Sequence, residues 1–496
     1  MSRKWVILAI IVLIYLPVSI DATVLHVAIP TLSSTLSLSA NEMLWVIDIY
    51  SLIMAGLILP MGALGDRIGF KRLMLIGASI FGVASLMAAF ANSAYMLIAA
   101  RAFLGVGAAM ILPATLAGVR NTFLDEKQRN YALGVWGTVG GGGAAFGPLL
   151  GGFILEHFSW GAVFLINVPI IILVLILTLW LVPKQTVQTK QPLNLLQALI
   201  LVIAILMLIY SIKTSIYAFS FWMVLVFAVG LCLLVGFVRH QLRAVQPMID
   251  FSLFKNPVIS TSIVMAMVAM IALVGFELLL SQELQFVYGY TPLEAGLFIL
   301  PFMIAISIGG PFTSVLMNHY GLRPVATVGM LMCAVCFFGL AMTDFGTHYI
   351  QAWVWMVLMG ISVEIALLSS TAAIMSAVSP EKATAAGAIE GMAYELGAGL
   401  GVAIFGLLLS LFYAQSIVLP DTLPANMLTE ASSSIGEAIS LLRHLDPALM
   451  QELKQAASDA FIHSHSKVLT ISGVMFLILS IFVWRALPDK VKSTDS

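Results

Sequence analysis

Long apolar stretches recur along this chain of 496 residues and constrain its fold more than any other feature. Hydrophobic residues make up 61% of the sequence and charged residues only 9%, whereas soluble domains carry about 25% charged residues. A soluble fold of this length cannot cover that much apolar surface, so lipid must cover it. We therefore expect an all-α polytopic membrane protein, because about 20 apolar residues in a helix cross a bilayer with every backbone hydrogen bond satisfied.

Fourteen apolar windows can be placed, which predicts 14 transmembrane helices joined mostly by short connections. The exception is the polar segment 415–463, expected as an extracytoplasmic loop with short helices near 430–445 and 447–462. The windows are 5–29, 44–61, 72–91, 95–117, 131–155, 162–182, 193–212, 219–238, 258–282, 293–317, 323–343, 349–372, 383–414 and 464–487.

Two stretches indicate an internal repeat. Residues 63–71 read ALGDRIGFK and residues 315–323 read VLMNHYGLR, which places Gly321 on Gly69 and Arg323 on Lys71. An offset of eight windows between halves of six leaves windows seven and eight as an insert. This 6 + 2 + 6 plan predicts a six-helix bundle at 1–183, a two-helix insert at 184–250 and a second six-helix bundle at 251–496. Repeats of this kind mark secondary transporters.

Positive charge predicts the orientation. With the N-terminus inside, most of the 23 Lys and Arg residues fall in the inside segments and only a few outside. Cytoplasmic segments carry this excess, so both termini are expected to be cytoplasmic. The run after Met1-Ser-Arg-Lys shows no cleavage site, and we expect it to remain as the first helix.

Charged side chains within or at the edges of the windows are candidates for function, because a charge at the bilayer centre costs ~2.5–3.5 kcal/mol. They are Asp21, Asp48, Glu277, Glu283, Glu364, Glu390, Glu395 and Arg101. Buried carboxylates either take up protons or neutralise a cation. The acidic excess therefore favours a cation exporter driven by protons, with no nucleic-acid partner indicated by a net charge of −1.

Asp21 and Arg101 are expected to pair. Asp21 lies ~24 Å from the inner face along an outward helix, and Arg101 lies ~21 Å from it along an inward helix, at 1.5 Å per residue in a ~30 Å core. A guanidinium beside Asp21 would oppose its protonation until a rearrangement separates the two. A static buried ion pair is the alternative.

Helix thirteen carries two acids on different faces. Glu390 and Glu395 are about 140° apart on a helix of 3.6 residues per turn, whereas Tyr394 shares the face of Glu390. We expect Glu390 and Tyr394 to face a central cavity, with less weight on Glu395, and Glu364 is a further candidate nearer the inside.

Four groups lie nearer the outer side. Asp48 is expected within about one turn of the outer end of its helix, as an entry contact or as a plain interfacial residue. Glu277 and Glu283 are expected near the outer end of span nine, with Glu283 solvated. The pair His463 and His465, at the end of the long loop, is also expected to be solvated.

Glycine is dense in the fifth window. Gly143, Gly147 and Gly151 repeat every four residues, a spacing that lets helices approach closely. They predict a packing seam, and with Pro148 and Gly152 a surface that moves during transport. Among the tryptophans, most are expected as interfacial anchors, and Trp136 is a candidate to stack on a flat organic cation.

Five stretches together resemble motifs of the major facilitator superfamily. Residues 62–72 (GALGDRIGFKR) resemble its loop motif after the second helix, 101–107 (RAFLGVG) its fourth-helix motif and 143–152 (GAAFGPLLGG) its fifth-helix antiporter motif. Residues 21–30 (DATVLHVAIP) and 164–169 (FLINVP) are similar to first- and sixth-helix signatures of the fourteen-helix drug–proton antiporters. The resemblance covers the whole chain in order.

The resemblance implies proton coupling at Arg101 and Asp21, and acidic substrate sites at Asp48, Glu390 and Glu395. It also implies gating by the loop and fifth-helix motifs. The positions concerned are Gly62, Asp66, Arg67, Gly69, Lys71, Arg72, Gly143, Gly147, Pro148, Gly151 and Gly152. The chain departs from the family patterns at Phe70, Leu104 and Gly161, which affects details of gating rather than antiport.

The group it resembles most implies export of lipophilic organic cations across the bacterial inner membrane in exchange for protons. These cations include quaternary ammonium compounds, methyl viologen, dyes and biguanide antiseptics. No Walker A pattern is present, so we expect no ATP hydrolysis, no enzyme activity and no cofactor. Cys333 and Cys336 have no second cysteine pair, so no metal site is expected.

Other readings remain open. An antiporter of the same architecture could carry a metal–tetracycline complex, a siderophore or an amino acid. A membrane sensor or scaffold would need no coupling motifs, and the motifs argue against it. A channel would be identified by flux that is not coupled to protons. We expect a monomer whose partners are the lipid bilayer, protons and small lipophilic cations.

Overall fold

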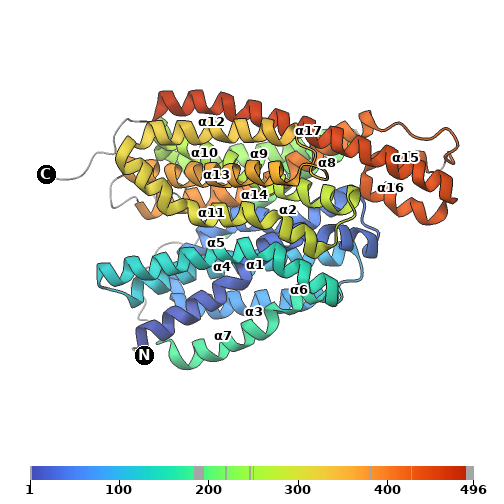
Figure 1. The fold of residues 1–496 in the computed structure, drawn as a ribbon. Coiled ribbons are helices and arrows are strands. Elements are labelled where there is room, and N and C mark those ends of the chain that lie inside the picture. Colours follow the sequence, from blue (N-terminus) through green and yellow to red (C-terminus); the bar gives the residue numbers. More distant parts are fainter. Residues whose placement is uncertain are drawn as a thin grey trace.

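The computed structural model describes residues 3–183, 195–217, 220–244, 247, 249, 251–378, 383–425 and 427–487. Figure 1 shows helices packed side by side along one common direction. The helices are α1 (Arg3–Leu36), α2 (Ala40–Ile68), α3 (Phe70–Ala89), α4 (Ala94–Thr122), α5 (Glu126–His157), α6 (Ala162–Leu165), α7 (Asn167–Leu181), α8 (Leu195–Tyr217), α9 (Phe221–Arg243), η1 (Phe251–Lys255), α10 (Pro257–Gln282), η2 (Glu283–Val287), α11 (Pro292–Tyr320), α12 (Leu322–Ala341), α13 (Tyr349–Ala377), α14 (Ala383–Ser416), α15 (Leu428–Ser433), α16 (Ile435–Leu441), η3 (Leu442–His444) and α17 (Pro447–Ala486).

Within these described ranges, 12 helices are long and apolar enough to cross a membrane, or up to 13 if the bent α5 counts as one span. Helices α6 and α7 together make one such span, Ala162–Leu181, whereas the apolar part of α8, Leu196–Ile212, is shorter than the others. Each predicted window falls on a helix. The all-helical membrane fold is therefore confirmed, and the count of 14 spans stays a prediction.

Two groups of helices form the two halves. Helices α1 and α3 to α7 lie together in the lower part of Figure 1, α10 to α14 with α17 lie in the upper part, and α2 lies at the border, beside α14. Between them in sequence, α8 packs on α2, where Val202 fills the space beside Gly56. Helix α9 buries little beyond Gly230, Phe237 and Gln241. The predicted ends of the insert at 184–250 lie in part outside the described residues.

The halves repeat the same local structure, as the aligned stretches predicted. Gly69 and Gly321 both have positive φ, at 85° and 88°, and each separates two consecutive helices of its half. A residue with a Cβ is strained in that conformation, which explains glycine at both places. Capping boxes begin α2 at Ser39 and α11 at Thr291, so the repeat extends to the helix starts.

Lys71 and Arg323 occupy equivalent positions and hold equivalent helix ends. Lys71 Nζ donates to the carbonyls of Leu179 and Val182 at 3.0 and 2.6 Å, and Arg323 Nε donates to that of Leu487 at 2.6 Å. Both contacts lie at the C-terminus of the last helix of a half, where a positive charge is favourable. Lys71 and Arg323 thus cap the last helix of their respective halves in the same way.

The segment 415–463 is more helical than predicted. The piece expected as a separate helix at 447–462 is the first part of α17, which runs unbroken for 40 residues. Helices α15 and α16 project beyond the membrane bundle at one end (Figure 1). We call this the cap end, and the opposite end, where α1 begins and α17 ends, the termini end.

The cap touches both halves. Glu437 of α16 accepts a hydrogen bond from the backbone N–H of Ala40 at 3.0 Å, at the start of α2. Tyr413 of α14 donates to the carbonyl of Ala431 at 3.3 Å. The cap therefore connects the two halves at this end.

A polar cluster orders the cap end of the second half. Tyr288 donates to Asp344 at 2.9 Å, and Thr347 and the N–H of Gly346 also donate to this carboxylate. Slight burial raises the pKa of Asp344, but these hydrogen bonds outweigh it and lower the pKa below its ordinary value. Burial, followed by the nearby Glu283, raises the pKa of Tyr288. The link joins the end of η2 to the turn between α12 and α13.

Candidate functional site

Asp21 and Arg101 form a buried ion pair at mid-depth in the first half. The Arg101 guanidinium donates to the carboxylate of Asp21, and each side chain is only 1% exposed. The pairing predicted from helix depth is confirmed. Its role in proton coupling stays a prediction.

Further contacts fix Arg101 in place. Its Nε donates to the carbonyl of Val46 at 3.1 Å, and its guanidinium lies 4.5 Å from the centre of the Tyr50 ring. Such a cation–π contact stabilises a desolvated cation by ~2 kcal/mol. The other carboxylate oxygen of Asp21, Oδ1, is buried without a hydrogen-bond partner.

Trp136 lies against Tyr15 rather than alone. The two rings stack with centroids 4.5 Å apart and an interplanar angle of 4°, and the indole N–H donates to Thr115 at 3.1 Å. One face of the indole is therefore occupied by Tyr15, which left no clear signal in the sequence because it sits among apolar residues of the first window.

Glu395 points from α14 towards the first half. Its carboxyl group is hydrogen-bonded by Ser51 of α2, and it interacts electrostatically with Tyr15 and Tyr50. An acid from the second half therefore lies close enough to Tyr15 and Tyr50 of the first half to interact with both. Ser51 and Tyr50 were missed by the sequence reasoning.

Glu390 is held within its own half. Thr371 and Ser370 of α13 donate to Glu390 Oε1 at 2.8 and 3.1 Å, and Tyr394 donates to it at 3.1 Å. The predicted shared face of Glu390 and Tyr394 is confirmed, as is the separation from Glu395. Glu395, which received less weight, is the acid that reaches the first half, and the prediction that Glu390 and Tyr394 face a central cavity stays a prediction.

Glu364 and Asp48 lie at other points of the interior. Half-buried Glu364 packs over Gly309 and Gly310 of α11, where an added Cβ would lie 3.0 and 3.3 Å from its atoms. Asp48 is only 1% exposed, because α2 begins at Ala40 and Asp48 lies two turns further along. Interfacial exposure of Asp48, one of the two predicted options, is therefore wrong.

The glycines of α5 form two seams. A Cβ at Gly143, Gly147 or Gly151 would lie within 2.7 Å of a side-chain atom of α1, which confirms the predicted close packing. Gly152 lies against the backbone of α11 at Pro292 and Leu293, and Pro148 lies against Gly296. The first seam is internal to one half, and the second joins the halves at the cap end.

The loop motif lies at the termini end, between α2 and α3. Gly62 faces Pro113 of α4, Arg67 and Arg72 are exposed, and Phe70, one of the departures from the family pattern, is buried. Asp66 belongs to α2, and its side chain lies outside the described part of the chain. The gating role of this motif stays a prediction.

Two buried histidines contact buried glutamates. His26 Nδ1 of α1 lies 3.0 Å from Glu277 Oε2 of α10, and each side chain is 1% exposed. His465 of α17 is hydrogen-bonded through Nδ1 to Glu283 of η2. The expectation that Glu283 and His465 are solvated was wrong, since both are at least 97% buried.

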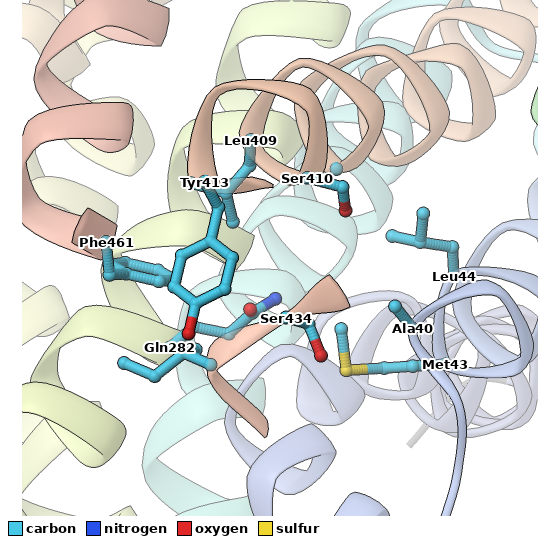
Figure 2. Close-up of a pocket in the computed structure, with 11 residues that line it drawn as sticks. Ala40, Met43, Leu44, Gln282, Leu409, Ser410, Tyr413, Ser434 and Phe461 are labelled. Atoms are coloured by element: carbon cyan, nitrogen blue, oxygen red, sulfur yellow. The ribbon is translucent and has the colours of Figure 1, made fainter. Parts of the chain in front are cut away.

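A small pocket opens at the cap end and contains none of the predicted site residues. Figure 2 shows Ala40, Met43 and Leu44 on one side and Leu409, Ser410 and Tyr413 on another, with Gln282, Ser434 and Phe461 completing the wall. No charged side chain lines it. Within the described residues, no cluster of three His, Cys, Asp or Glu side chains could hold a metal ion.

Sequence comparison decides the family. The profile of the Major Facilitator Superfamily matches residues 11–402. The chain belongs to this superfamily. This member is therefore a multi-pass membrane transporter and not an enzyme.

Along nearly its full length the chain is similar to a methyl viologen resistance protein and to a multidrug efflux pump. It is 58% identical over 489 residues to "Methyl viologen resistance protein SmvA" of Salmonella typhimurium (strain LT2), covering 98% of this chain and 99% of that protein. It is 35% identical over 477 residues to "Multidrug efflux pump LfrA" of Mycolicibacterium smegmatis, covering 96% and 95%. The resemblance drawn from the motifs is confirmed.

Solved structures agree on the fold. A bacterial homologue of the human lysosomal transporter Spinster matches with a TM-score of 0.70 at 17% identity, covering 98% of this chain and 99% of that one. At this identity the likeness supports the fold of this superfamily member and nothing finer.

Proposed function

We propose that this transporter exports lipophilic organic cations, including methyl viologen, quaternary ammonium compounds, dyes and biguanide antiseptics, across the bacterial inner membrane in exchange for protons. The observation that carries the proposal is the imbalance of buried charge. Five carboxylates (Asp21, Asp48, Glu277, Glu283 and Glu390) are buried in the described residues, against one guanidinium, Arg101, and two histidines, His26 and His465. The name of the 58% identical relative, a methyl viologen resistance protein, supports the same substrate class.

We propose that the two halves alternate access to a site between them. The cation is held by Glu395, which reaches towards the first half through Ser51, and by the stacked rings of Tyr15 and Trp136. Glu390 and Glu364, together with Asp48 and Tyr394, supply further negative or polar groups. A cation over a ring face gains cation–π stabilisation, and each neighbouring carboxylate adds attraction in a low dielectric.

Proton coupling is assigned to Asp21 with Arg101. A proton on Asp21 removes the charge that balances the guanidinium, so protonation and cation binding disfavour one another. We further propose fourteen spans, a monomer, and an orientation with the cap end outside and both termini in the cytoplasm.

Transport of methyl viologen or ethidium into inverted membrane vesicles, with and without an imposed proton gradient, tests the proposal. Gradient-driven uptake should fall at least tenfold in Asp21→Asn and in Glu390→Gln. Glu156→Gln, which changes an exposed acid at the end of α5, is the matched control and should transport normally. Unimpaired gradient-driven uptake in Asp21→Asn would remove the coupling role, and absence of cation uptake under a verified gradient would remove the substrate class.

A further inference from the structure

His26 and Glu277 join the first helices of the two halves. His26 lies on α1 and Glu277 on α10, and their side chains meet at 3.0 Å with 1% exposure each. The Asp21–Arg101 pair lies within the first half and the His465–Glu283 pair within the second. Of these three pairs, only His26–Glu277 must break when the halves separate at the cap end.

The contact is embedded in a closed region of the interface. Next to His26, the carbonyl of Val27 accepts a hydrogen bond from Gln285 of η2 at 3.1 Å. Nearer the cap, Gly152 lies against the backbone of Leu293. The pair is therefore sealed from water in this conformation.

The atoms of the pair that do not meet are buried without hydrogen bonds. They are Nε2 of His26 and Oε1 of Glu277, and Nδ1 of His26 also makes no hydrogen bond, since its 3.0 Å contact with Glu277 Oε2 is close in distance alone. A dry carboxylate without a counter-charge is costly, and a neutral imidazole gives it no charge to pair with. A protonated imidazole does, so the closed contact favours one bound proton.

We propose that His26 and Glu277 form a second proton-binding site, at which closure of the cap end takes up one proton from outside. When the halves separate, water solvates both groups, the proton leaves the imidazole, and the carboxylate remains ionised in water. This inference rests on the proposed antiport. In that transport cycle, closure of the cap end from the outward-facing state requires one proton.

Other charged groups around the pair are already engaged. Glu283 is paired with His465, and Asp21 is paired with Arg101 from α4. Glu437 of α16 accepts from the backbone of Ala40, and Glu294 of α11 closes its own capping box with Thr291. On the remaining neighbours of α1, Asp48 is buried on α2 and Glu156 and His157 are exposed at the end of α5.

Spin labels at two exposed cap-end positions test the proposal by their separation. Tyr95, at the start of α4, is 79% exposed, and Met342, at the end of α12, is 89% exposed, so both accept a label after replacement by cysteine. Cys232 is exposed and is replaced by serine. Electron–electron distance measurements in lipid nanodiscs then give the ratio of separated to closed molecules between pH 5.5 and 8.5.

The separated fraction should rise with pH, by up to about tenfold in the ratio per pH unit, which is the limit for one linked proton. Glu277→Gln should abolish this rise, because closure then needs no proton, whereas His26→Gln leaves a stranded carboxylate that can itself take up the proton and should keep a rise. Glu283→Gln is the matched control, since its partner His465 lies in the same half, and it should keep the rise.

A pH-independent ratio in the parent protein, or a rise retained in Glu277→Gln, overturns the proposal. The measurement needs no transported substrate. A failure to export cations would therefore remove the proposed function while leaving the pH-dependent closure standing, and the reverse result would remove only this proton site.

Discussion

The Asp21–Arg101 pair allows a double-variant prediction with a definite magnitude. In Asp21→Asn the guanidinium stays buried without a counter-charge, although it keeps the hydrogen bond to Val46 at 3.1 Å and the Tyr50 ring at 4.5 Å. Removing one partner of a buried pair costs ~3–5 kcal/mol. The asparagine carbonyl can still accept one hydrogen bond, worth ~1 kcal/mol, so we expect a loss of about 3 kcal/mol.

Replacement of the other partner, Arg101→Met, should lower the free energy of unfolding by less. In Arg101→Met the stranded carboxylate of Asp21 can take up a proton, whereas a guanidinium cannot give one up. Its cost should therefore shrink as the pH falls from 8 to 6, while that of Asp21→Asn stays constant. The double variant removes both charges and should lie within about 1 kcal/mol of the parent, because apolar replacement of a buried pair is often neutral.

Reversible unfolding in mixed detergent and SDS micelles measures these free energies, and the double-variant cycle should give a coupling energy of about 3 kcal/mol. The double variant should be stable yet unable to couple transport to protons. If its loss equals the sum of the two single losses, the pair does not carry the stability assigned to it and the reasoning is refuted.

Two further predictions concern packing and helix ends. Gly147→Val should lower the melting temperature of the purified protein, since its Cβ would collide with α1, whereas Gly142→Ala, with open space around it, should not; equal melting temperatures would exclude the seam. Arg323→Ala should increase amide hydrogen exchange several-fold in the last turn before Leu487, whose carbonyl it caps, and the exposed Arg485→Ala should leave exchange unchanged. Equal exchange in both variants would mean that the cap does not hold this helix end.

Depth along a helix could be predicted from the sequence, because the rise per residue is constant. This is why Asp21 and Arg101 were paired correctly from two windows alone. The same arithmetic failed for Asp48, because the apolar window begins at 44, whereas the capping box of Ser39 and Glu42 starts the helix earlier. His465 was misplaced for the same reason, since α17 extends far beyond its apolar part.

Rotation about the helix axes could not be predicted. The sequence places Glu390 and Glu395 on different faces of α14, but which face meets the first half depends on how α14 packs against α2. The contact of Glu395 with Ser51 and its interactions with Tyr15 and Tyr50 distinguish the two acids. The stacking of Tyr15 on Trp136 has the same origin, because it joins two windows whose relative rotation leaves no periodic signal.

A movement of the halves affects two contacts of α1 differently, the Asp21–Arg101 pair and the His26–Glu277 pair. Asp21 and His26 are about 140° apart around the helix, so Asp21 meets α4 of its own half and His26 meets α10 of the other. If the halves move as rigid bodies, as repeats of this kind do, the Asp21–Arg101 distance stays constant while the His26–Glu277 contact must break. A proton on Asp21 therefore cannot be controlled by separation from Arg101. The protonation of Asp21 must then be controlled by a group of the other half. Glu395, beside Tyr50 and Tyr15, is the acid placed to do so.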